Sequence, residues 1–572
     1  MNGLTLLLGA SALFLVGYAV YSKFLSRVLG IDPSRPTPAH TRQDGCDYVP
    51  AHPTVLFGHH FAAIAGAGPI VGPVLAAEFG WASVTLWIVF GCILIGAAHD
   101  MIALFLSVRH DGESIGSVIG TILGRPGKVL FLLFSWSALI LVVAEFNRQI
   151  AGTFVADPAI ATASLLFIGE AILFGLCVYR LKMPVLWASL IFVPLMFAFV
   201  WIGNVIPFDI VKLLGITPET AGMVWVITLL IYCFFASTCP VWILLQPRDY
   251  LNAYLLYAMM ALGFLGVFIA HPTLNIDAFA GFSAVGRSGG TDMLFPFLFV
   301  TVACGACSGF HSLISTGTTS KQLDNEKNAK AIGYGSMLIE SALGIISLIA
   351  VGMVSKTFIV DGAFKGAPPV AFAQGIAKMF GYTDNNNAIY ALLTLAVSVF
   401  ALTSLDTGTR LSRFMFSELF LKEGEATYKD AKNPVRKVLA FPLFGTVLMV
   451  VIGCVLGGLQ LSQIWGLFGA ANQLLAGIAL MAVAAWLGEV GKNNKMFIIP
   501  TIFMLGATLT QLVRTIITKV TAMTHAATPE LAAKAFHWGN WFQLLFASAM
   551  AILAVVLVVE GARTFSKQCK KN

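Results

Sequence analysis

Long runs of apolar residues alternate with short polar stretches along the whole chain. A helix that spans a membrane needs about 20 consecutive, mostly apolar residues. Windows of this kind recur throughout the sequence, and their pattern predicts about fifteen transmembrane helices. The predicted helices cover residues 3–29, 54–79, 83–107, 127–150, 159–180, 184–205, 222–245, 249–270, 292–318, 329–355, 388–420, 437–457, 463–487, 496–518 and 540–561.

The composition excludes several other classes of protein. Charged residues make up 11% of the 572 residues and hydrophobic residues make up 58%, whereas an ordinary soluble protein carries about 25% charged residues. A water-soluble globule, a disordered chain, a nucleic-acid-binding protein and a secreted disulfide scaffold are therefore excluded. We expect an all-α polytopic membrane protein that is surrounded by the lipid bilayer.

Basic residues in the predicted loops give the orientation of the chain. The loops after windows one, three, five, nine, eleven, thirteen and fifteen are rich in Lys and Arg, and the opposite loops are poor in them. Because basic residues collect on the cytoplasmic side of a membrane, the N-terminus is expected outside and the C-terminus in the cytoplasm. The residues behind this prediction include Arg35, Arg42, Arg109, Arg125, Arg180, Lys182, Lys321, Lys327, Lys330, Lys422, Lys429, Lys432 and Lys492.

Two of the predicted helices carry helix-breaking residues at their centres. The window at 54–79 contains three glycines and two prolines between Gly66 and Pro73, and the window at 292–318 contains Gly305 and Gly309. Glycine has poor helix propensity, and proline removes a backbone donor. Unwound backbone at membrane depth is tolerated only where it is buried in protein or lines a cavity. Both helices are therefore expected to be interrupted.

The predicted topology makes these two interrupted helices run in opposite directions. Interrupted helices at corresponding positions of two inverted halves point to the substrate site of a transporter. The first five-helix repeat is expected at 54–205 and the second at 292–487, with a helix pair inserted at 206–291. Residues 1–53 and 488–572 are expected to form accessory segments outside this core.

At each break, the amide N–H groups that restart the helix lack partners and carry the positive end of the helix dipole. Such groups suit an anionic substrate such as a carboxylate. The alternative is that the small residues serve helix packing. The predicted substrate-binding residues are Gly66, Ala67, Gly68 and Pro69 at the first break and Gly305, Ser308, Gly309 and His311 at the second.

Acidic residues inside the predicted helices are candidates for ion coupling, because a charge at the bilayer centre costs about 2.5–3.5 kcal/mol. The candidates are Asp100, Glu340 and Asp406, together with the hydroxyl of Thr407 as a ligand for a cation or a substrate oxygen. Asp406 and Arg410 are four residues apart, so they are also able to neutralise each other on one helix face.

Other polar residues are candidates for gates that open and close the substrate path. His59 and His60 precede the first break, Glu145 and Arg148 are expected near the outer end of their helix, and Arg248 lies at a predicted cytoplasmic turn. Arg410 completes this group. Histidine near an entry path also suits a proton relay.

A metal site is not expected. His59, His60, His99 and His311 occur in helices that also hold Asp100, Cys304 and Cys307. Adjacent histidines cannot both face one ion on a regular helix, and neither HExxH nor a second CxxC pair is present. The sequence therefore predicts no cofactor and no enzyme activity, although a metal-ion transporter stays an alternative.

Five long motifs resemble the carbon starvation protein A family. They are GHHFAAIAGAGPIVGPVLAA, QPRDYLN, GFHSLISTGTTSKQL, ALTSLDTGTR and FGAANQLLA, and they extend in this order from about residue 57 to 480. The resemblance implies a transporter of the bacterial inner membrane that takes up peptides in nutrient starvation or pyruvate by proton symport. It also implies the amino acid-polyamine-organocation superfamily and a leucine-transporter-like core of two inverted five-helix repeats.

The expected function is therefore secondary import of a small carboxylate-bearing nutrient, pyruvate or a short peptide, with protons during carbon starvation. A membrane nutrient sensor without transport is the alternative from another class. Such a sensor would need a separate partner protein, because the longest predicted cytoplasmic loops hold only a few tens of residues. The choice between pyruvate and peptide, the choice between proton and sodium, and the oligomeric state stay open.

Overall fold

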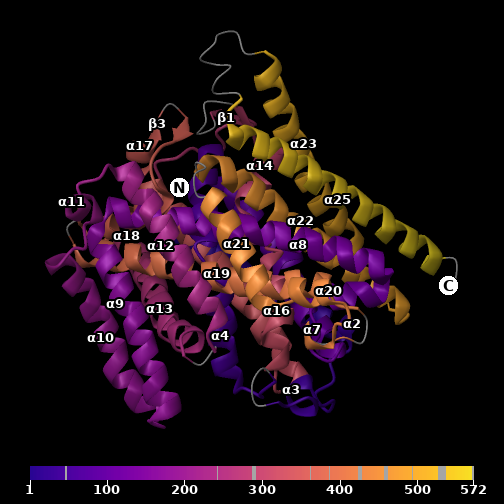
Figure 1. Cartoon of the computed structure of the whole chain (residues 1–572). Coiled ribbons are helices and arrows are strands. Elements are labelled where there is room, and N and C mark those ends of the chain that lie inside the picture. Colours follow the sequence, from indigo (N-terminus) through magenta and orange to yellow (C-terminus); the bar gives the residue numbers. More distant parts are fainter. Residues whose placement is uncertain are drawn as a thin grey trace.

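The computed structural model describes residues 1–44, 48–240, 243–285, 291–360, 362–384, 387–422, 425, 428–456, 461–492, 494–525 and 536–569. Each predicted window coincides with a helix or with an interrupted helix (Figure 1). In the described part of the chain, twelve helices are long and apolar enough to cross a membrane, and a bent pair adds a thirteenth crossing. The protein is therefore an all-α polytopic membrane protein.

The helices before the centre of the chain begin with a continuous element made of α1 (Gly3–Val16), η1 (Gly17–Tyr21) and α2 (Ser22–Leu29). It ends at Gly30, whose φ of 68° is left-handed. The elements that follow are α3 (Pro38–Thr41), α4 (Pro53–Ile64), α5 (Gly68–Ala76), η2 (Ala77–Phe79), α6 (Trp81–Leu86), η3 (Trp87–Gly96), α7 (Ala97–Arg109), α8 (Ile115–Ala156), α9 (Pro158–Gly175), η4 (Leu176–Arg180), α10 (Val185–Val205), α11 (Ile210–Leu214), α12 (Pro218–Thr238) and α13 (Leu245–Ala270).

The second part of the chain starts with a hairpin of β1 (Ser283–Val285) and β2 (Thr291–Met293). It continues with α14 (Leu294–Thr301), α15 (Ala303–Ala306), α16 (Phe310–Gly317), η5 (Thr319–Lys321), η6 (Glu326–Asn328), η7 (Lys330–Gly335), α17 (Ser336–Phe358), β3 (Ile359–Val360), β4 (Ala363–Phe364), α18 (Pro368–Met379), α19 (Ala388–Leu419), η8 (Tyr428–Asp430), α20 (Pro434–Leu439), α21 (Pro442–Leu456), α22 (Leu461–Glu489), α23 (Lys495–Thr524) and α25 (Trp538–Cys569). Of these, α18 and the two hairpins were not predicted from the sequence.

Both predicted interruptions are present. The first separates α4 from α5 at Ala65–Ala67, and the two helices are bent by 45° to each other. Pro69 follows directly as the second residue of α5. The second interruption leaves the helical conformation at Val302, with ψ of 47°, and again at Cys307, with ψ of 124°. The first break therefore lies at the predicted glycines, whereas the second lies at Val302 and Cys307 and not at Gly305 or Gly309, which are both helical.

The unwound backbone of the second interruption is held by close approaches of glycine. A Cβ atom on Gly72 of α5 would lie 2.6 Å from the carbonyl oxygen of Thr301, and one on Gly469 of α22 would lie 2.5 Å from that of Val300. Only glycine permits neighbouring elements to approach this closely without a shift of the backbone. The broken segment is thus enclosed by protein, as unwound backbone in a membrane requires.

The helices around the two interruptions pack as corresponding pairs. Helices α8 and α19 lie side by side, α12 packs on α8 as α21 packs on α19, and α12 contacts α21. Helix α13 packs on α4 and α19, and α22 packs correspondingly on the broken segment α14–α16 and on α8. In contrast, α10 packs mainly on α9 at one edge of the molecule, and α9 separates it from much of α8, α13 and α19. Helices α23 and α25 lie at the opposite edge (Figure 1).

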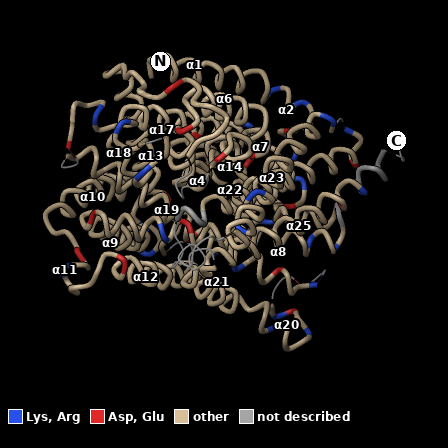
Figure 2. The backbone as a smooth tube through the Cα atoms, turned by 90° about the horizontal axis from the view of Figure 1, so that it is seen from above, with Lys and Arg blue, Asp and Glu red and all other residues tan. Residues whose placement is uncertain are grey.

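Charged residues are sparse along the chain when it is seen from above (Figure 2). The core of the bundle is apolar, and a small set of charged side chains is nevertheless fully buried within it. Because such burial is expensive without partners, these side chains mark the places where the fold holds polar chemistry.

Candidate functional site

A cavity lies where the first interruption meets the second. It is lined by Ile64, Gly66, Gly68, Val142, Phe146, Cys304, Phe310, Ser404 and Phe468, which come from α4, α5, α8, α15, α16, α19, α22 and the α4–α5 break. The cavity has room for only about one water molecule. The structure is therefore a closed conformation of this site.

The first interruption supplies amide N–H groups that are free to bind a ligand. In the described part of the chain, the N–H groups of Ala67 and Gly68 have no hydrogen-bond partner. The N–H of Gly66 donates to the carbonyl of Ile64 at 2.8 Å, and Pro69 has no N–H. Two consecutive free amides at the start of a helix form an anion-binding element. Gly66 and Gly68, the residues on either side of Ala67, both line the cavity.

The second interruption differs, because α22 already occupies its amides. The N–H of Phe310 donates to the side-chain oxygen of Asn472 at 2.8 Å, and the N–H of Gly309 donates to the backbone carbonyl of Asn472 at 3.1 Å. The Ser308 hydroxyl also contacts the Asn472 side chain. Asn472 therefore caps α16. Of the residues near this break, Cys304 and Phe310 line the cavity, whereas Gly305, Ser308, Gly309 and His311 do not.

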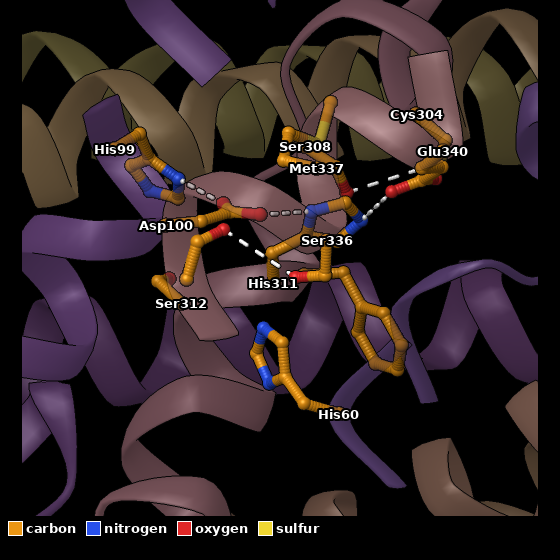
Figure 3. A network of polar contacts seen from close by, with 12 residues as sticks. His60, His99, Asp100, Cys304, Ser308, His311, Ser312, Ser336, Met337 and Glu340 are labelled. Carbon is orange, nitrogen blue, oxygen red and sulfur yellow. Dashed lines mark hydrogen bonds and ion pairs between the residues drawn. The ribbon is translucent and has the colours of Figure 1, made fainter. Parts of the chain in front are cut away.

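Three buried ionisable residues from different helices meet behind this break (Figure 3). Asp100 of α7 lies 2.7 Å from Nδ1 of His311 in α16, and Nε2 of His311 lies 3.5 Å from the carboxylate of Glu340 in α17. All three side chains are buried. The other oxygen of Asp100 lies 2.9 Å from Nδ1 of His99. We call these four residues, His99, Asp100, His311 and Glu340, the His–Asp–His–Glu network.

The network joins Asp100 and Glu340, which the sequence suggested for ion coupling, with His311, which it suggested for substrate binding. Asp100 and Glu340 are brought together by His311, although they are far apart in the chain. Interacting carboxylates and imidazoles exchange protons as one unit and not as separate groups. His311 lies in α16, directly after the second interruption, and the same helix presents Phe310 to the cavity.

Asp406 belongs to a second, separate network. It forms an ion pair with the fully buried Arg248, and it accepts hydrogen bonds from the Tyr232 hydroxyl at 2.8 Å and the Cys233 thiol at 3.2 Å. Arg248 also contacts Asp249 at 3.0 Å. These contacts connect α12, α13 and α19. The expectation that Asp406 pairs with Arg410 four residues later is corrected by this geometry.

Arg410 instead donates to backbone carbonyls at the end of α12. Its guanidinium lies 3.1 Å from the Ala236 oxygen and 2.7 Å from the Cys239 oxygen. Carbonyl groups at a helix C-terminus carry the negative end of the dipole, and a cation there is favourable. Thr407 is half-buried, and it belongs to neither network.

The remaining gate candidates lie at different depths from those expected. Helix α8 continues to Ala156, so Glu145 stands eleven residues before its end and is fully buried. It directly precedes Phe146, which lines the cavity. The expected place near the outer surface is therefore corrected, because the helix is longer than its apolar window. Arg148 is half-buried one turn later, and His59 is half-buried in α4.

His60 is fully buried in α4, and it forms a single hydrogen bond. Its Nδ1 lies 2.8 Å from the Thr319 hydroxyl, and its Nε2 has no partner in the described part of the chain. No group of three or more His, Cys, Asp or Glu residues suited to a metal ion occurs among the described residues.

Several residues of the site carried no distinct signal in the sequence. Phe146, Phe310 and Phe468 line the cavity, but the chain contains 44 phenylalanines, so this residue type does not single out a site. Ser404 was one of several hydroxyls in its segment. Asn472 did carry a signal, because an amide within an apolar run suits a residue that bridges helices or lines the substrate route.

Comparisons with known proteins connect this architecture to transporters. The family model described as carbon starvation protein CstA matches residues 2–365 and 362–511. The peptide transporter CstA of Campylobacter jejuni is 33% identical and is aligned over 89% of this chain and 80% of its own length. The peptide transporter CstA of Bacillus subtilis is 33% identical over 86% of this chain and 87% of its own length. The pyruvate/proton symporter BtsT of Escherichia coli is 30% identical over 88% of this chain and 80% of its own length.

Solved structures give fainter likenesses. MhsT in complex with L-phenylalanine is 15% identical, with a TM-score of 0.44 over 88% of this chain and 98% of its own. A manganese transporter of Eremococcus coleocola is 13% identical, with a TM-score of 0.39 over 91% of this chain and 99% of its own.

Proposed function

Because the chain belongs to the carbon starvation protein CstA family, we propose that it imports a small carboxylate-bearing nutrient together with protons. The observation that carries this proposal is the pair of free amides at Ala67 and Gly68, which stand beside a closed cavity in the middle of the bundle. The relatives named as a peptide transporter and as a pyruvate/proton symporter support both substrate classes.

The cavity favours a short monocarboxylate such as pyruvate over a peptide. Among the described residues its lining contains no acidic side chain, so the ammonium group of a peptide would have only the neutral Ser404 hydroxyl and backbone carbonyls as acceptors. Four of the nine lining residues are Ile64, Phe146, Phe310 and Phe468, which suit a small apolar tail. A three-carbon acid needs a modest outward movement of these side chains, whereas a peptide needs a much larger one.

The His–Asp–His–Glu network is the proposed site of proton coupling. The network links α7, α16 and α17, and α16 is the helix that restarts after the second interruption. A proton taken up by Asp100, His311 or Glu340 changes the charge that these helices share. This change biases the position of α16 relative to α7 and α17, and through it the shape of the cavity.

The ion pair between Arg248 and Asp406 is the proposed lock of the cytoplasmic side. It ties α13 to α19, and α13 packs directly on α4. Movement of α4 away from the core, which opens a path to the cytoplasm, therefore strains these contacts. The gate roles of His59, Glu145, Arg148 and Arg410 stay predictions of the same kind.

The packing favours a different division of the repeats from the one expected from sequence. Helix α12 contacts α8 as α21 contacts α19. Helix α13 contacts α4 and α19, and α22 correspondingly contacts the broken segment α14–α16 and α8. We therefore propose that α4–α8 together with α12 and α13 form the first repeat, and that α14–α22 without α18 form the second. Helices α9 and α10, and not residues 206–291, are then the inserted pair.

The proposed location is the bacterial cytoplasmic membrane, with the N-terminus outside and the C-terminus in the cytoplasm. The distribution of Lys and Arg supports this orientation. The loop between α7 and α8 and the segment between α16 and α17 then face the cytoplasm. Both make polar contacts to residues 30–51, through Asp111 in the first and Asp324 in the second.

Uptake of labelled pyruvate into proteoliposomes tests the proposal. With an acidic exterior we expect accumulation that an uncoupler abolishes, and a dipeptide in excess should compete weakly. Gly68→Leu should abolish uptake, because its side chain would meet Cys304 and fill the cavity. Uptake that is indifferent to the uncoupler would refute proton coupling, and intact uptake in Gly68→Leu would refute the site.

A further inference from the structure

Ser404 of α19 carries a buried hydroxyl that faces the cavity. Its side chain is 3% exposed, and it belongs to the residues that line the cavity. In the described part of the chain, this hydroxyl has no hydrogen-bond partner. A buried polar group without a partner is costly, so the hydroxyl is suited to a ligand that fills the cavity.

Other hydroxyl groups of α19 are occupied by their own helix. Those of Thr394, Thr403 and Thr409 each donate to the backbone carbonyl four residues earlier, at 2.8–3.0 Å. This local bond is a common one for a serine or threonine inside a helix. Because Ser404 does not form it, its hydroxyl is available to a partner outside α19.

The Ser404 hydroxyl is directed at the first interruption. A Cβ atom on Gly66 would collide with Oγ of Ser404, whereas it would lie 3.7 Å from the Ser404 Cβ. The hydroxyl oxygen is therefore the part of this side chain nearest to Gly66. The free N–H groups belong to the next two residues, Ala67 and Gly68, and consecutive Cα atoms are about 3.8 Å apart. One small molecule is thus able to reach the amides and the hydroxyl together.

The other polar side chain of the lining is already engaged. The Cys304 thiol lies 3.8 Å from the Ser308 hydroxyl, and the Asn472 amide donates to the Cys304 sulfur at 3.6 Å. The remaining lining residues are glycines or carry apolar side chains. Among the residues that the structure describes, Ser404 is therefore the one side chain of the lining with a free hydrogen-bond donor.

We propose that Ser404 recognises the oxygen on the second carbon of a 2-oxo acid. The carboxylate rests on the N–H groups of Ala67 and Gly68, and the Ser404 hydroxyl donates to the neighbouring keto oxygen. A keto oxygen only accepts hydrogen bonds, and it stands on the carbon next to the carboxylate. This arrangement matches a donor placed beside two free amides, so the site selects 2-oxo monocarboxylates over monocarboxylates that lack this oxygen.

The inference rests on the proposed import of a small carboxylate, and it adds which feature of the substrate the site distinguishes. An acid without the keto oxygen leaves the Ser404 hydroxyl buried and unpaired, and a site built around such a hydrogen bond discriminates against that acid. Pyruvate and propionate share the carboxylate and the length of the carbon chain but differ at this oxygen. Their comparison therefore isolates the contact with Ser404.

The test measures competition by unlabelled acids with the counterflow of labelled pyruvate in proteoliposomes. In the wild type, pyruvate should compete about tenfold more strongly than propionate. Ser404→Ala should weaken competition by pyruvate about tenfold and change competition by propionate less than about twofold, so that the preference disappears. Thr409→Val removes a hydroxyl that is bonded within α19, and this control should keep the wild-type preference.

Three results would overturn the role of Ser404. Equal competition by the two acids in the wild type would do so without any variant, and so would an unchanged preference in Ser404→Ala. An equal loss for both acids in Ser404→Ala would place the hydroxyl on the shared carboxylate or on a coupling cation, which also contradicts the inference. A wild-type protein without pyruvate counterflow would instead refute the proposed function, on which the inference rests.

Discussion

The close contact between α16 and α22 gives a sharp test of how the second interruption is held. Gly309 lies where the helices approach most closely, and a Cβ atom there would stand 2.5 Å from the backbone nitrogen of Ala476. The same atom would also meet the Asn472 carbonyl oxygen and the Leu475 side chain. Gly305, only four residues earlier, has no atom closer than 3.6 Å to such a Cβ.

Gly309→Ala should therefore destabilise the protein, whereas Gly305→Ala should not. Overpacking of this kind costs about 1–3 kcal/mol. The shift that relieves it also disturbs the hydrogen bonds from the Gly309 and Phe310 N–H groups to Asn472, which are worth about 1 kcal/mol each. The expected total is about 3–5 kcal/mol for Gly309→Ala and less than about 0.5 kcal/mol for Gly305→Ala.

The assay is the fraction of purified protein that stays monodisperse in detergent after heating over a series of temperatures. Gly309→Ala should lose its monodisperse peak at a clearly lower temperature than the wild type, and Gly305→Ala should follow the wild type. Equal shifts in the two variants, or a larger shift in Gly305→Ala, would refute the claim that α22 clamps the restart of α16.

Three further variants test other contacts. Asn472→Ala should lower thermal stability in the same heating assay by about 1–3 kcal/mol for each group left unpaired, because the Phe310 N–H and the Ser308 hydroxyl lose their partner; unchanged stability would contradict the capping role. Glu340→Gln should flatten the dependence of net pyruvate uptake on external pH while counterflow persists, and a pH profile like that of the wild type would argue against coupling through this carboxylate. Glu326→Gln should cost about 3 kcal/mol of thermal stability, because the carboxylate is 1% exposed and accepts from Arg109 and from the Asp32 N–H; a stability that matches the wild type would show that this contact is dispensable.

The sequence predicted the helices well because spanning a membrane imposes a length and a composition on each of them. The first interruption was predicted for a local reason, since Gly66, Gly68 and Pro69 act on the backbone at that point. The second lies in the predicted helix, but it leaves the helical conformation at Val302 and Cys307 and not at Gly309, which is helical. Helix α18 was missed because its twelve residues are shorter than a span and its apolar face is partial.

The division into repeats could not be read from hydropathy. The pairs α9–α10 and α12–α13 look alike as apolar windows, and only their packing distinguishes an inserted hairpin from a part of the core. Polar partners were equally hidden. Asp406 has Arg410 one turn away, but the fold brings Arg248 from 158 residues earlier in the chain to it. The side chains that neutralise a buried charge are thus determined by tertiary structure and not by local spacing.

The central claim is that substrate and protons move together through this protein. Proteoliposomes that enclose a pH-sensitive dye, with equal pH on both sides, test it most directly when pyruvate is added outside. Coupled import predicts that the lumen becomes acidic as pyruvate enters, and that Glu340→Gln abolishes this signal while pyruvate counterflow persists. Pyruvate accumulation without acidification, or the same acidification in protein-free vesicles, would contradict the account.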